Sequence, residues 1–453
     1  MNFSVVILAA GQGKRMCSDL PKVLHPLAGK PLLAHVLQAV ENLNPLQILC
    51  VHGHGGAQVI ETFKNKSIQW VEQTEQKGTG HAVKQTLHLI PDDHQVLVLY
   101  GDVPLIQTPT LQQLLSLSNN NVAVLTVNLE NPTGYGRMIR NDSKQIVQII
   151  EEKDATLEQR QIKEVNSGIL TAPAKKLKNW LNNLKPNNAQ GEYYLTDIIG
   201  IAVQENITIS SAQPTNPQEV FGINDRLQLA TLERYFQLQQ ATALMEKGVT
   251  LFDPNRLDIR GTVETGRDIV IDVNVILEGN VEIGHRVKIG AFCHLKDVSI
   301  GDDVEILPYS IFDHVIIEKN CKIGPFSRLR PETHLSENVH IGNFVELKKT
   351  TVAKNSKINH LSYVGDAQIG CEVNIGAGTI TCNYDGANKH QTIIEDRVFV
   401  GSDTQLIAPV TIAEGTTIGA GSTITKNTVP NSLTLSRSPQ KSITTWQRPV
   451  KKH

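Results

Sequence analysis

Near its start the chain carries residues whose types and spacing suit phosphate chemistry. The segment Leu8-Ala9-Ala10-Gly11-Gln12-Gly13-Lys14-Arg15-Met16 follows an apolar run and joins a glycine turn to two cations. Backbone N–H groups of such a turn can approach phosphates, and Lys14 and Arg15 can neutralise them. The segment lacks the third glycine of a dinucleotide-binding turn and the ending of a P-loop. A purely structural tight turn is therefore an equal alternative.

Two further residues extend this group. Lys22 adds another cation shortly after the turn, and Asp102 directly follows the apolar run that ends at Tyr100-Gly101. A carboxylate there can hold Mg²⁺ against phosphates, because this ion needs only one or two protein ligands beside water and phosphate oxygens. An Asp that caps the next helix is an equal alternative.

A second candidate group lies beyond residue 320. Arg330 and Lys348 each follow an interior-type aliphatic residue and lie one repeat of three hexapeptides apart. On neighbouring coils of a solenoid the two cations would be roughly 5 Å apart, where like charges repel, and a bound phosphate would offset that cost. His360, in the same region, could take a proton from an amine, since imidazole suits general-base catalysis. Solvated surface residues remain the alternative for all three.

Composition and charge exclude several classes of protein. The 453 residues are 40% hydrophobic and 19% charged, and the formal net charge is −2. This length predicts two or three domains, and the near-neutral charge argues against a nucleic-acid binder. No apolar run is long enough to cross a bilayer, and the start has no secretory-signal pattern. With six scattered cysteines and no C-x-x-C pair, these features predict a cytoplasmic protein with free thiols.

Strands interleaved with helices are expected to position the phosphate-binding candidates around Arg15, Lys22 and Asp102. The apolar runs that predict buried strands are 4–8, 47–51, 96–99 and 122–127, and the segments with helical spacing are 32–40, 79–90 and 109–117. This alternation predicts βαβ units and hence a mostly parallel, Rossmann-like sheet with both faces covered. Ligands bind such sheets beyond the carboxyl ends of the strands. The loops after Leu8 and Leu99 are therefore the places to expect a site.

After residue 250 the period changes to six. The aliphatic residues of this series are Ile271, Leu277, Ile283, Ile289, Leu295, Ile300, Ile306, Ile317, Ile323, Leu329, Leu335, Ile341, Leu347, Val352, Ile358, Val364, Ile394, Val400, Leu406, Ile412, Ile418 and Ile424. A period of six fits neither a helix nor simple strand alternation, and it is typical of hexapeptide repeats in a parallel β-helix. The register is lost between Ile375 and Ile394, which predicts a loop on one face.

Between the two patterns, residues 225–247 are rich in polar residues, carry leucines on one stripe and end at Gly248, so they predict a connecting helix. The predicted organisation is an α/β domain over 1–226, a linker helix over 227–248, and a left-handed parallel β-helix with a C-terminal arm over 249–453.

Together these motifs resemble a known family. The glycine turn with Arg15, Pro21-Lys22, Gln73, Gly78-Thr79-Gly80 and Tyr100-Gly101-Asp102 look like those of the sugar-nucleotide pyrophosphorylases. With the hexapeptide half, the whole chain resembles the bifunctional N-acetylglucosamine-1-phosphate uridyltransferase/glucosamine-1-phosphate acetyltransferases of bacteria. The resemblance implies acetyl transfer from acetyl-CoA to glucosamine-1-phosphate. It then implies Mg²⁺-dependent uridylyl transfer from UTP, which yields UDP-N-acetylglucosamine for peptidoglycan and lipopolysaccharide synthesis.

The resemblance assigns residues to the uridylyl-transfer site. It places Gln73 and Gly78 at the uracil, and Asp102 and Asn224 on Mg²⁺. Around the acetylated sugar it places Tyr100, Gly136, Glu151 and Asn166. Arg15 and Lys22 are implied to be catalytic, as cations that stabilise the transferring phosphates. The remaining residues implied to bind substrate are Leu8, Ala9, Ala10, Gly11, Thr79 and Gly101.

The resemblance also assigns an acetyl-transfer site, with His360 as the catalytic base. The residues implied to bind the sugar phosphate are Arg330, Lys348, Tyr363 and Asn374, and those implied to bind acetyl-CoA are Ala377, Asn383, Tyr384, Ser402, Ala420 and Arg437. Glu346 could orient His360. Solenoids of this class are usually trimers, so the resemblance implies a homotrimer with acetyl sites between subunits.

Two other functions remain open. The solenoid could be purely regulatory or oligomerising beside an active nucleotidyltransferase, and release of free thiol from acetyl-CoA would decide against this. Alternatively, the chain could be a non-catalytic nucleotide-exchange subunit of translation initiation, which can share both folds. Failure to form UDP-sugar from UTP would favour that alternative.

Overall fold

The computed structural model describes residues 1–119 and 121–451, and its contacts divide the chain into two compact units, Met1–Phe236 and Gln237–His453. The division falls inside the long helix α7 (Arg226–Glu246). The hydrophobic residues Leu229, Leu232 and Phe236 on the first half of α7 pack within the first unit, whereas Ala241 and Leu244 join the core of the second.

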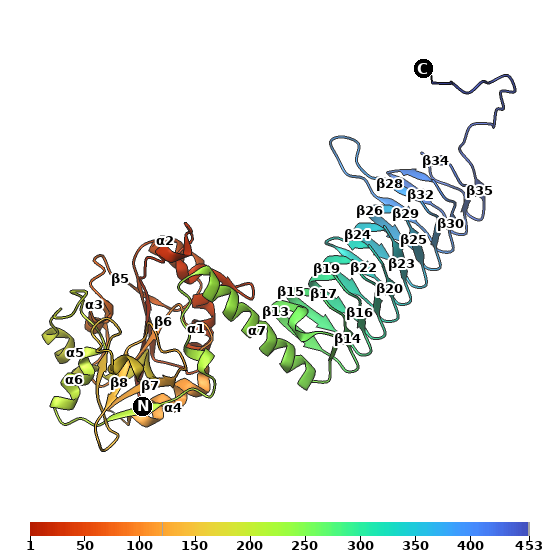
Figure 1. Ribbon diagram of the computed structural model, residues 1–453. Coiled ribbons are helices and arrows are strands. Elements are labelled where there is room, and N and C mark those ends of the chain that lie inside the picture. The colour runs from red at the N-terminus through yellow and green to blue at the C-terminus, as the bar shows by residue number, and fades with distance from the viewer. Residues whose placement is uncertain (120, 452–453) are drawn as a thin grey trace. The chain divides into compact units, whose positions relative to one another are not determined.

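The first unit is built on a nine-stranded, mostly parallel sheet (Figure 1). The order along its main path is β11 (Ile209–Ala212), β7 (Val122–Asn128), β10 (Glu164–Pro173), β6 (Gln95–Tyr100), β1 (Phe3–Ala9), β4 (Gln47–His52) and β5 (Gln69–Glu72). Only β10 runs antiparallel on this path, between β7 and β6. The antiparallel pair β8 (Arg137–Arg140) and β9 (Ile146–Ile150) extends the sheet from β10.

Helices bury both faces of this sheet because its strands are apolar on both sides. On β1, Val5 and Ile7 enter one core and Val6 and Leu8 enter the other, which is the alternation that a strand imposes. The helices of the first core are α1 (Leu32–Glu41), α2 (Gly56–Thr62) and α4 (Thr108–Ser118), and those of the second are α3 (Thr79–Thr86), α5 (Ala174–Asn183) and α6 (Asp197–Gln204).

Short elements complete the first unit and the start of the second. They are the 3₁₀ helices η1 (Lys14–Met16), η2 (Lys22–Leu24), η3 (Leu87–Leu89), η4 (Gln159–Gln161), η5 (Pro217–Val220) and η6 (Pro254–Arg256), and the small hairpin β2 (Pro26–Leu27) and β3 (Lys30–Pro31). The loops after β1 and β6 emerge at the same edge of the sheet, since Gly101 N donates to Leu8 O at 2.9 Å.

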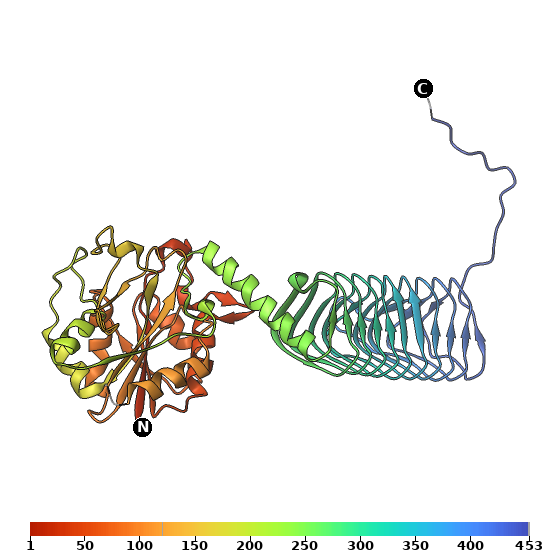
Figure 2. The same cartoon turned by 60° about the horizontal axis from the view of Figure 1, so that its bottom comes forward.

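The second unit is a parallel β-helix whose strands pair with their equivalents on the next coil. One sheet holds β12 (Thr250–Leu251), β14 (Val270–Ile271), β16 (Lys288–Ile289), β18 (Glu305–Ile306), β20 (Lys322–Ile323), β23 (His340–Asn343), β25 (Lys357–His360), β27 (Asn374–Ile375), β30 (Phe399–Val400), β33 (Thr417–Ile418) and β35 (Leu433–Thr434). The other holds β13 (Leu257–Thr265), β15 (Val275–Ile283), β17 (His294–Ile300), β19 (Ile311–Ile317), β21 (Arg328–Leu329), β22 (Thr333–Leu335), β24 (Glu346–Val352), β26 (Tyr363–Ile369), β28 (Ile380–Cys382), β29 (Thr392–Ile394), β31 (Gln405–Ile407), β32 (Val410–Ile412) and β34 (Thr423–Ile424). Figure 2 shows the coils as a regular stack.

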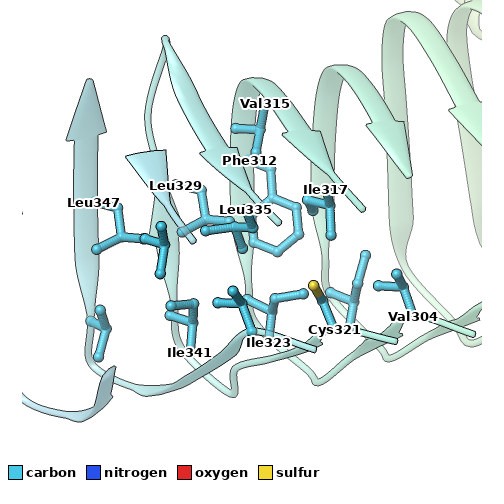
Figure 3. Packing of buried hydrophobic residues seen from close by; sticks show 14 of the residues in the cluster. Val304, Phe312, Val315, Ile317, Cys321, Ile323, Leu329, Leu335, Ile341 and Leu347 are labelled. Atoms are coloured by element: carbon cyan, nitrogen blue, oxygen red, sulfur yellow. The ribbon is translucent and has the colours of Figure 1, made fainter. Parts of the chain in front are cut away.

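The interior of the coils is filled by the aliphatic series with the six-residue period. Every member of the series from Ile271 to Ile424 is at most 4% exposed. Leu329 and Leu347 lie directly opposite on neighbouring coils, and their side chains point into the same interior as Phe312 (Figure 3). Each side chain therefore packs on its equivalents above and below, which explains why the period is kept along the chain.

One corner of the solenoid carries an exposed stack of aromatic rings. Phe292, Tyr309, Phe326 and Phe344 stack with ring centroids 4.9, 4.9 and 5.3 Å apart. All four residues have φ between 56° and 61°, because the same left-handed turn recurs at this corner on each coil. Phe344 follows Asn343, so the stack ends beside the coil that carries His360.

The predicted fold class is confirmed: a mostly parallel α/β unit precedes a parallel β-helix of hexapeptide repeats. All predicted strands and helices of the first 130 residues are present with small shifts of their ends. The predicted interruption is a loop between β28 and β29, closed by a bridge between Tyr384 and Lys389. Within residues 1–119 and 121–451, no helix has the length and apolar character needed to cross a membrane.

Candidate active sites

The loops at the carboxyl edge of the first sheet line a cavity of about 320 Å³. Nine residues predicted from the sequence to bind substrate line it, namely Leu8, Ala9, Ala10, Gly11, Lys22, Gln73, Gly78, Thr79 and Tyr100, together with Asp102. The end of β1 supplies the first four and the end of β6 supplies Tyr100. Gly101 connects Tyr100 to Asp102 and is held by its N–H bond to Leu8.

Lys22, Asp102 and Asn224 form a compact charged cluster at this cavity. Lys22 Nζ donates to Asp102 Oδ2 and, at 3.1 Å, to Asn224 Oδ1. The Lys22 and Asp102 side chains are only 12% and 15% exposed. Two hard oxygen atoms thus converge on one cation, which is the donor chemistry that Mg²⁺ prefers. The residues present fit that ion, with phosphate oxygens and water as its other ligands.

Arg15 does not lie in this cluster. It is exposed on η1, which follows the glycine turn, and lines neither this cavity nor the next. Its assigned role therefore stays a prediction.

A second cavity of about 260 Å³ adjoins the first and shares Thr79, Tyr100 and Glu192 with it. The four residues predicted to surround the acetylated sugar, Tyr100, Gly136, Glu151 and Asn166, all line this second cavity. Gly168 has a φ of +85°, and a Cβ there would lie 2.5 Å from the Tyr100 ring, so only glycine lets the ring take this position.

Burial raises the pKa of two acidic groups, Glu151 at the second cavity and Asp197 near it. It raises the pKa of Glu151, although the Thr196 hydroxyl, which donates to Glu151 Oε1 at 3.0 Å, opposes this. Burial, with Glu151 and Asp154 nearby, also raises the pKa of Asp197 to about 6. The Tyr194 hydroxyl is buried at this cavity without a hydrogen-bond partner among the described residues, so it can serve a polar ligand.

Sequence reasoning missed several lining residues of the two cavities. These are Gln76, Tyr135, Gln190, Glu192, Tyr194 and Thr196. Gln76 has a clear role, since its Nε2 donates to Ala10 O at 2.8 Å and fixes the loop after β1. The run Glu192-Tyr193-Tyr194 places two tyrosines and a carboxylate together between two helices. This local composition is the sequence signal that could have identified the run as part of a site.

At the other end of the first cavity, Gln73 is 5% exposed and contacts Gly78 and His81. Gly78 has a φ of +102°, and a Cβ there would lie 2.6 Å from Tyr193 O. The tight packing of this loop explains why glycine occupies the position.

In the β-helix, Arg330 and Lys348 lie on neighbouring coils, as their spacing predicted, because Leu329 pairs with Leu347. Arg330 Nη1 donates to Glu346 at 2.9 Å, and Lys348 Nζ lies 3.6 Å from Asp366. Sequence reasoning missed Lys389, which the loop between β28 and β29 brings to this pair. The Lys348 ammonium beside it lowers the pKa of Lys389, and Arg330 adds to this effect. The three cations suit a phosphate group.

His360 ends β25 and is exposed, with its Nδ1 2.8 Å from Asn343 Oδ1 on the preceding coil. When Nδ1–H donates to this amide oxygen, the neutral ring keeps its lone pair on Nε2. The suggestion that Glu346 orients His360 is wrong, since Glu346 pairs with Arg330. The coil register opposes Asn343 to His360, whereas it opposes Glu346 to Tyr363.

Tyr363 and Asn383 meet over Gly365. A Cβ at Gly365 would lie 2.5 Å from the Tyr363 hydroxyl and 2.8 Å from Asn383 Nδ2. Asn383 donates to Asp366, which also faces Lys348. Predicted residues from β26 and the loop after β28 are thus brought together beside the cations.

The structure holds Asn374 and Tyr384 apart from that contact. Asn374 pairs with Lys357 on the other sheet of the solenoid. Tyr384 is exposed in the loop, where its hydroxyl donates to Gly386 O at 2.5 Å.

Four of the six residues predicted to bind acetyl-CoA, Ala377, Ser402, Ala420 and Arg437, form a column on successive coils. Asp403 N donates to Ala377 O at 2.7 Å, and Gly421 N donates to Ser402 O at 2.8 Å. Arg437 Nη1 reaches Ala420 O at 3.0 Å. Because Ile358 pairs with Ile375, the same register places Ala377 on the coil next to His360. The column therefore begins beside the predicted base.

Comparison with known proteins adds independent findings. Residues 5–163 match the MobA-like NTP transferase domain family. Residues 259–341 and 311–385 match the GMPPB C-terminal domain, and 391–426 match six bacterial transferase hexapeptide repeats.

Solved structures give weak matches to about half of the chain. A UDP-glucose pyrophosphorylase complexed with UDP-glucose is 16% identical with a TM-score of 0.44, over 52% of this chain and 98% of that one. A putative glucose-1-phosphate thymidylyltransferase from Bacillus anthracis is 18% identical with a TM-score of 0.42, over 51% and 94%.

Curated relatives match over the full length. The "Bifunctional protein GlmU" of Acinetobacter baylyi is 55% identical over 452 residues, which is 100% of this chain and 99% of the relative. The protein of the same name from Acinetobacter baumannii has the same identity and coverage. A match of this identity over both halves shows the family, and this chain belongs to the bifunctional GlmU proteins.

Proposed function

We propose that the chain makes UDP-N-acetylglucosamine at two separate sites. The β-helix acetylates glucosamine-1-phosphate with acetyl-CoA, and the α/β unit then transfers uridylyl from UTP to the product. The proposal rests chiefly on one observation in the first unit: Asp102 and Asn224 oxygens converge on Lys22 beside two adjoining cavities, which suit a nucleotide and a sugar.

In uridylyl transfer, an oxygen of N-acetylglucosamine-1-phosphate attacks the α-phosphorus of UTP. The bond from this phosphorus to the bridging oxygen breaks, and pyrophosphate leaves with that electron pair. Asp102 and Asn224 would hold Mg²⁺, which would neutralise charge on the phosphates. Lys22 stabilises the negative charge on the transferring phosphates, and the second cavity orients the sugar phosphate for attack. No side chain becomes covalently bonded.

In acetyl transfer, the amine of glucosamine-1-phosphate attacks the thioester carbon of acetyl-CoA. His360 Nε2 accepts the amine proton, which Asn343 favours by engaging Nδ1. The C–S bond breaks, and the sulfur takes the proton from His360 Nε2 and leaves as the thiol. Arg330, Lys348 and Lys389 hold the sugar phosphate, and the column from Ala377 to Arg437 supports the cofactor.

One assay tests the whole proposal. Glucosamine-1-phosphate, acetyl-CoA and UTP are given to the purified protein with Mg²⁺, and products are identified by mass spectrometry. We expect free CoA thiol, pyrophosphate and UDP-N-acetylglucosamine. UDP-sugar formation only from ready-made N-acetylglucosamine-1-phosphate would leave the solenoid without catalysis and contradict the second site.

The proposed setting is a homotrimer in the cytoplasm. Support for the trimer is the solenoid architecture together with the arm of residues 438–451, which is exposed and basic. Native mass spectrometry is expected to give three copies, and a monomer would contradict this part of the proposal.

A further inference from the structure

The Gln73 side chain at the first cavity has a fixed amide orientation. Its Nε2 lies 3.3 Å from Gly78 O and 3.0 Å from His81 Nδ1. Because a carbonyl oxygen can only accept, the atom facing Gly78 must be the amide nitrogen. Both amide hydrogens are then used within the protein. Gln73 Oε1 has no partner among the described residues, so it remains as an acceptor for a ligand in the cavity that Gln73 lines.

This arrangement requires a particular state of His81. To accept from Gln73, Nδ1 must carry the lone pair, so the ring is neutral with its hydrogen on Nε2. Gln85 Nε2 lies 3.1 Å from His81 Nε2 and also donates to His81 O at 3.3 Å. Because Gln85 is half-exposed, water can replace its bond to His81 O, and the amide can then turn so that its oxygen accepts from the Nε2 hydrogen. Gln73 decides the tautomer because it is buried, and an unpaired buried amide hydrogen costs more than an exposed one.

The surroundings of His81 favour the neutral ring. Burial lowers the pKa of His81 below its ordinary value, and the cations Lys77 and Lys84 lower it further, whereas Glu75 opposes them. The Tyr193 ring packs against the imidazole with centroids 6.4 Å apart. The charges and the packing around His81 therefore support the acceptor state at neutral pH.

We infer that His81 is a positioning residue for pyrimidine selection, because its Nδ1 holds the Gln73 amide with Oε1 facing the nucleobase. This inference rests on the proposed uridylyl transfer. Uracil carries N3–H, which can donate to Oε1, whereas cytosine carries a lone pair at N3 that Oε1 repels. A buried polar atom set against the wrong partner is an efficient source of selectivity.

The test compares UTP with CTP as co-substrates of N-acetylglucosamine-1-phosphate, using the full-length protein. His81→Phe removes the acceptor and keeps a ring. We expect the ratio of kcat/KM for UTP over CTP to fall about tenfold, as one lost hydrogen bond predicts. The loss should lie in KM for UTP with kcat nearly unchanged, since nucleobase contacts are the same in the ground and transition states. His81→Asn places an amide oxygen where Nδ1 stood and should keep the wild-type ratio.

The matched control is His88→Phe. His88 is exposed on η3, so this variant makes the same chemical change away from Gln73. Its ratio of kcat/KM for UTP over CTP should equal that of the wild type. A folded His81→Phe protein with an unchanged ratio would overturn the inference.

A pH series tests the same point without the Phe variant. Protonation turns His81 Nδ1 into a donor, and burial holds the pKa of His81 below its ordinary value of 6.5. The wild-type preference for UTP should therefore fall only as the pH is lowered below 6.5, and that of His81→Asn should stay level. Parallel profiles would overturn the inference even if His81→Phe does not fold. A wild-type protein that forms no UDP-sugar overturns the proposed function itself, whereas normal synthesis with an unmoved ratio overturns only the role of His81.

Discussion

Lys22 is the residue at which distant parts of the first unit meet. Its ammonium contacts Asp102, 80 positions away, and Asn224, 202 positions away. Asp102 follows β6 and Asn224 precedes α7. The cluster therefore forms only when the sheet and the segment before α7 are both folded. A largely buried ammonium with two oxygen partners is also costly to disrupt.

Asp102→Ala removes the carboxylate assigned to Mg²⁺ and to Lys22. We expect UDP-sugar formation to fall by at least about 100-fold, because metal stabilisation of phosphoryl transfer is worth several kcal/mol. Release of CoA thiol should be unchanged. Both rates are measured on the purified variant beside Asp142→Ala, a substitution of an exposed carboxylate. A folded Asp102→Ala protein with wild-type uridylyl transfer would refute the assignment.

His360→Ala removes the proposed base of acetyl transfer. The rate of thiol release should fall about 10²–10⁴-fold, the usual contribution of general-base catalysis, with uridylyl transfer intact. Asn343→Leu leaves the ring but removes the acceptor for Nδ1–H, so a smaller loss of about tenfold is expected. A larger loss of acetyl transfer in Glu346→Gln than in Asn343→Leu would contradict the pairing of His360 with Asn343.

Asp197 links burial to the pH dependence of stability. Its pKa is raised from 3.8 to about 6, so the folded chain binds this proton more tightly than the unfolded chain. Its contribution therefore lowers the free energy of unfolding as the pH rises from 3.8 to 6. Asp197→Asn should raise that free energy by about 1 kcal/mol at pH 7, a value reduced for solvent screening.

At pH 3.5 the same substitution should have a much smaller effect, because Asp197 is then protonated in the folded state and mostly protonated in the unfolded state. Urea unfolding followed by tryptophan fluorescence measures this, since Trp180 is 2% exposed in the same unit. Equal effects at both pH values would show that the substitution acts through packing instead.

At the scale of elements, the solenoid positions its outward side chains through the register of its coils. Neighbouring coils are hydrogen-bonded along both sheets, and their interiors are continuous. Close contacts between outward side chains then depend on small residues in the strands. Gly365, beneath Tyr363 and Asn383, is such a position.

Gly365→Ala would push a methyl group into the Tyr363 hydroxyl and the Asn383 amide. We expect acetyl transfer to fall at least about tenfold, because misplacing substrate-positioning groups by a fraction of an ångström is costly. Uridylyl transfer should be unaffected. Gly200→Ala in α6 is the control, since nothing lies within 4 Å of its added Cβ. Wild-type acetyl transfer in Gly365→Ala would show that Tyr363 and Asn383 do not act at the site.

At the scale of the molecule, α7 belongs to both units. Its first half buries Leu232 against Met16, Leu27 and Leu32, and Glu233 accepts from Ala28 N at 2.7 Å. The first unit therefore depends on residues beyond 226, where the sequence pattern placed the end of the α/β domain.

A fragment of residues 1–246 should fold and keep Mg²⁺-dependent uridylyl transfer from ready-made N-acetylglucosamine-1-phosphate. A fragment of residues 1–225 lacks α7 and exposes the cluster around Leu32, so its melting temperature should be clearly lower. The two are compared by calorimetry and by pyrophosphate release. A folded 1–246 fragment without activity would contradict two independent sites.

The sequence by itself determined both architectures and predicted many of the residues that line the two cavities of the first unit. Strand and helix periods follow from local backbone geometry, and the six-residue period follows from one interior side chain per face of a coil, so neither needs knowledge of distant contacts. The motifs around Lys22, Tyr100 and Asp102 could be recognised from the sequence for the same reason, because each is contiguous and follows a buried strand.

Tertiary structure decided which distant side chains touch. His360 opposes Asn343 at an offset of 17 residues, whereas Leu347 opposes Leu329 at 18, so the register between coils is not constant, and the sequence did not identify Asn343 as the partner of His360. Lys389 reaches Lys348 only through the path of an inserted loop. Such pairings depend on coil register and loop path, which are set by packing across many residues and leave no local period in the chain.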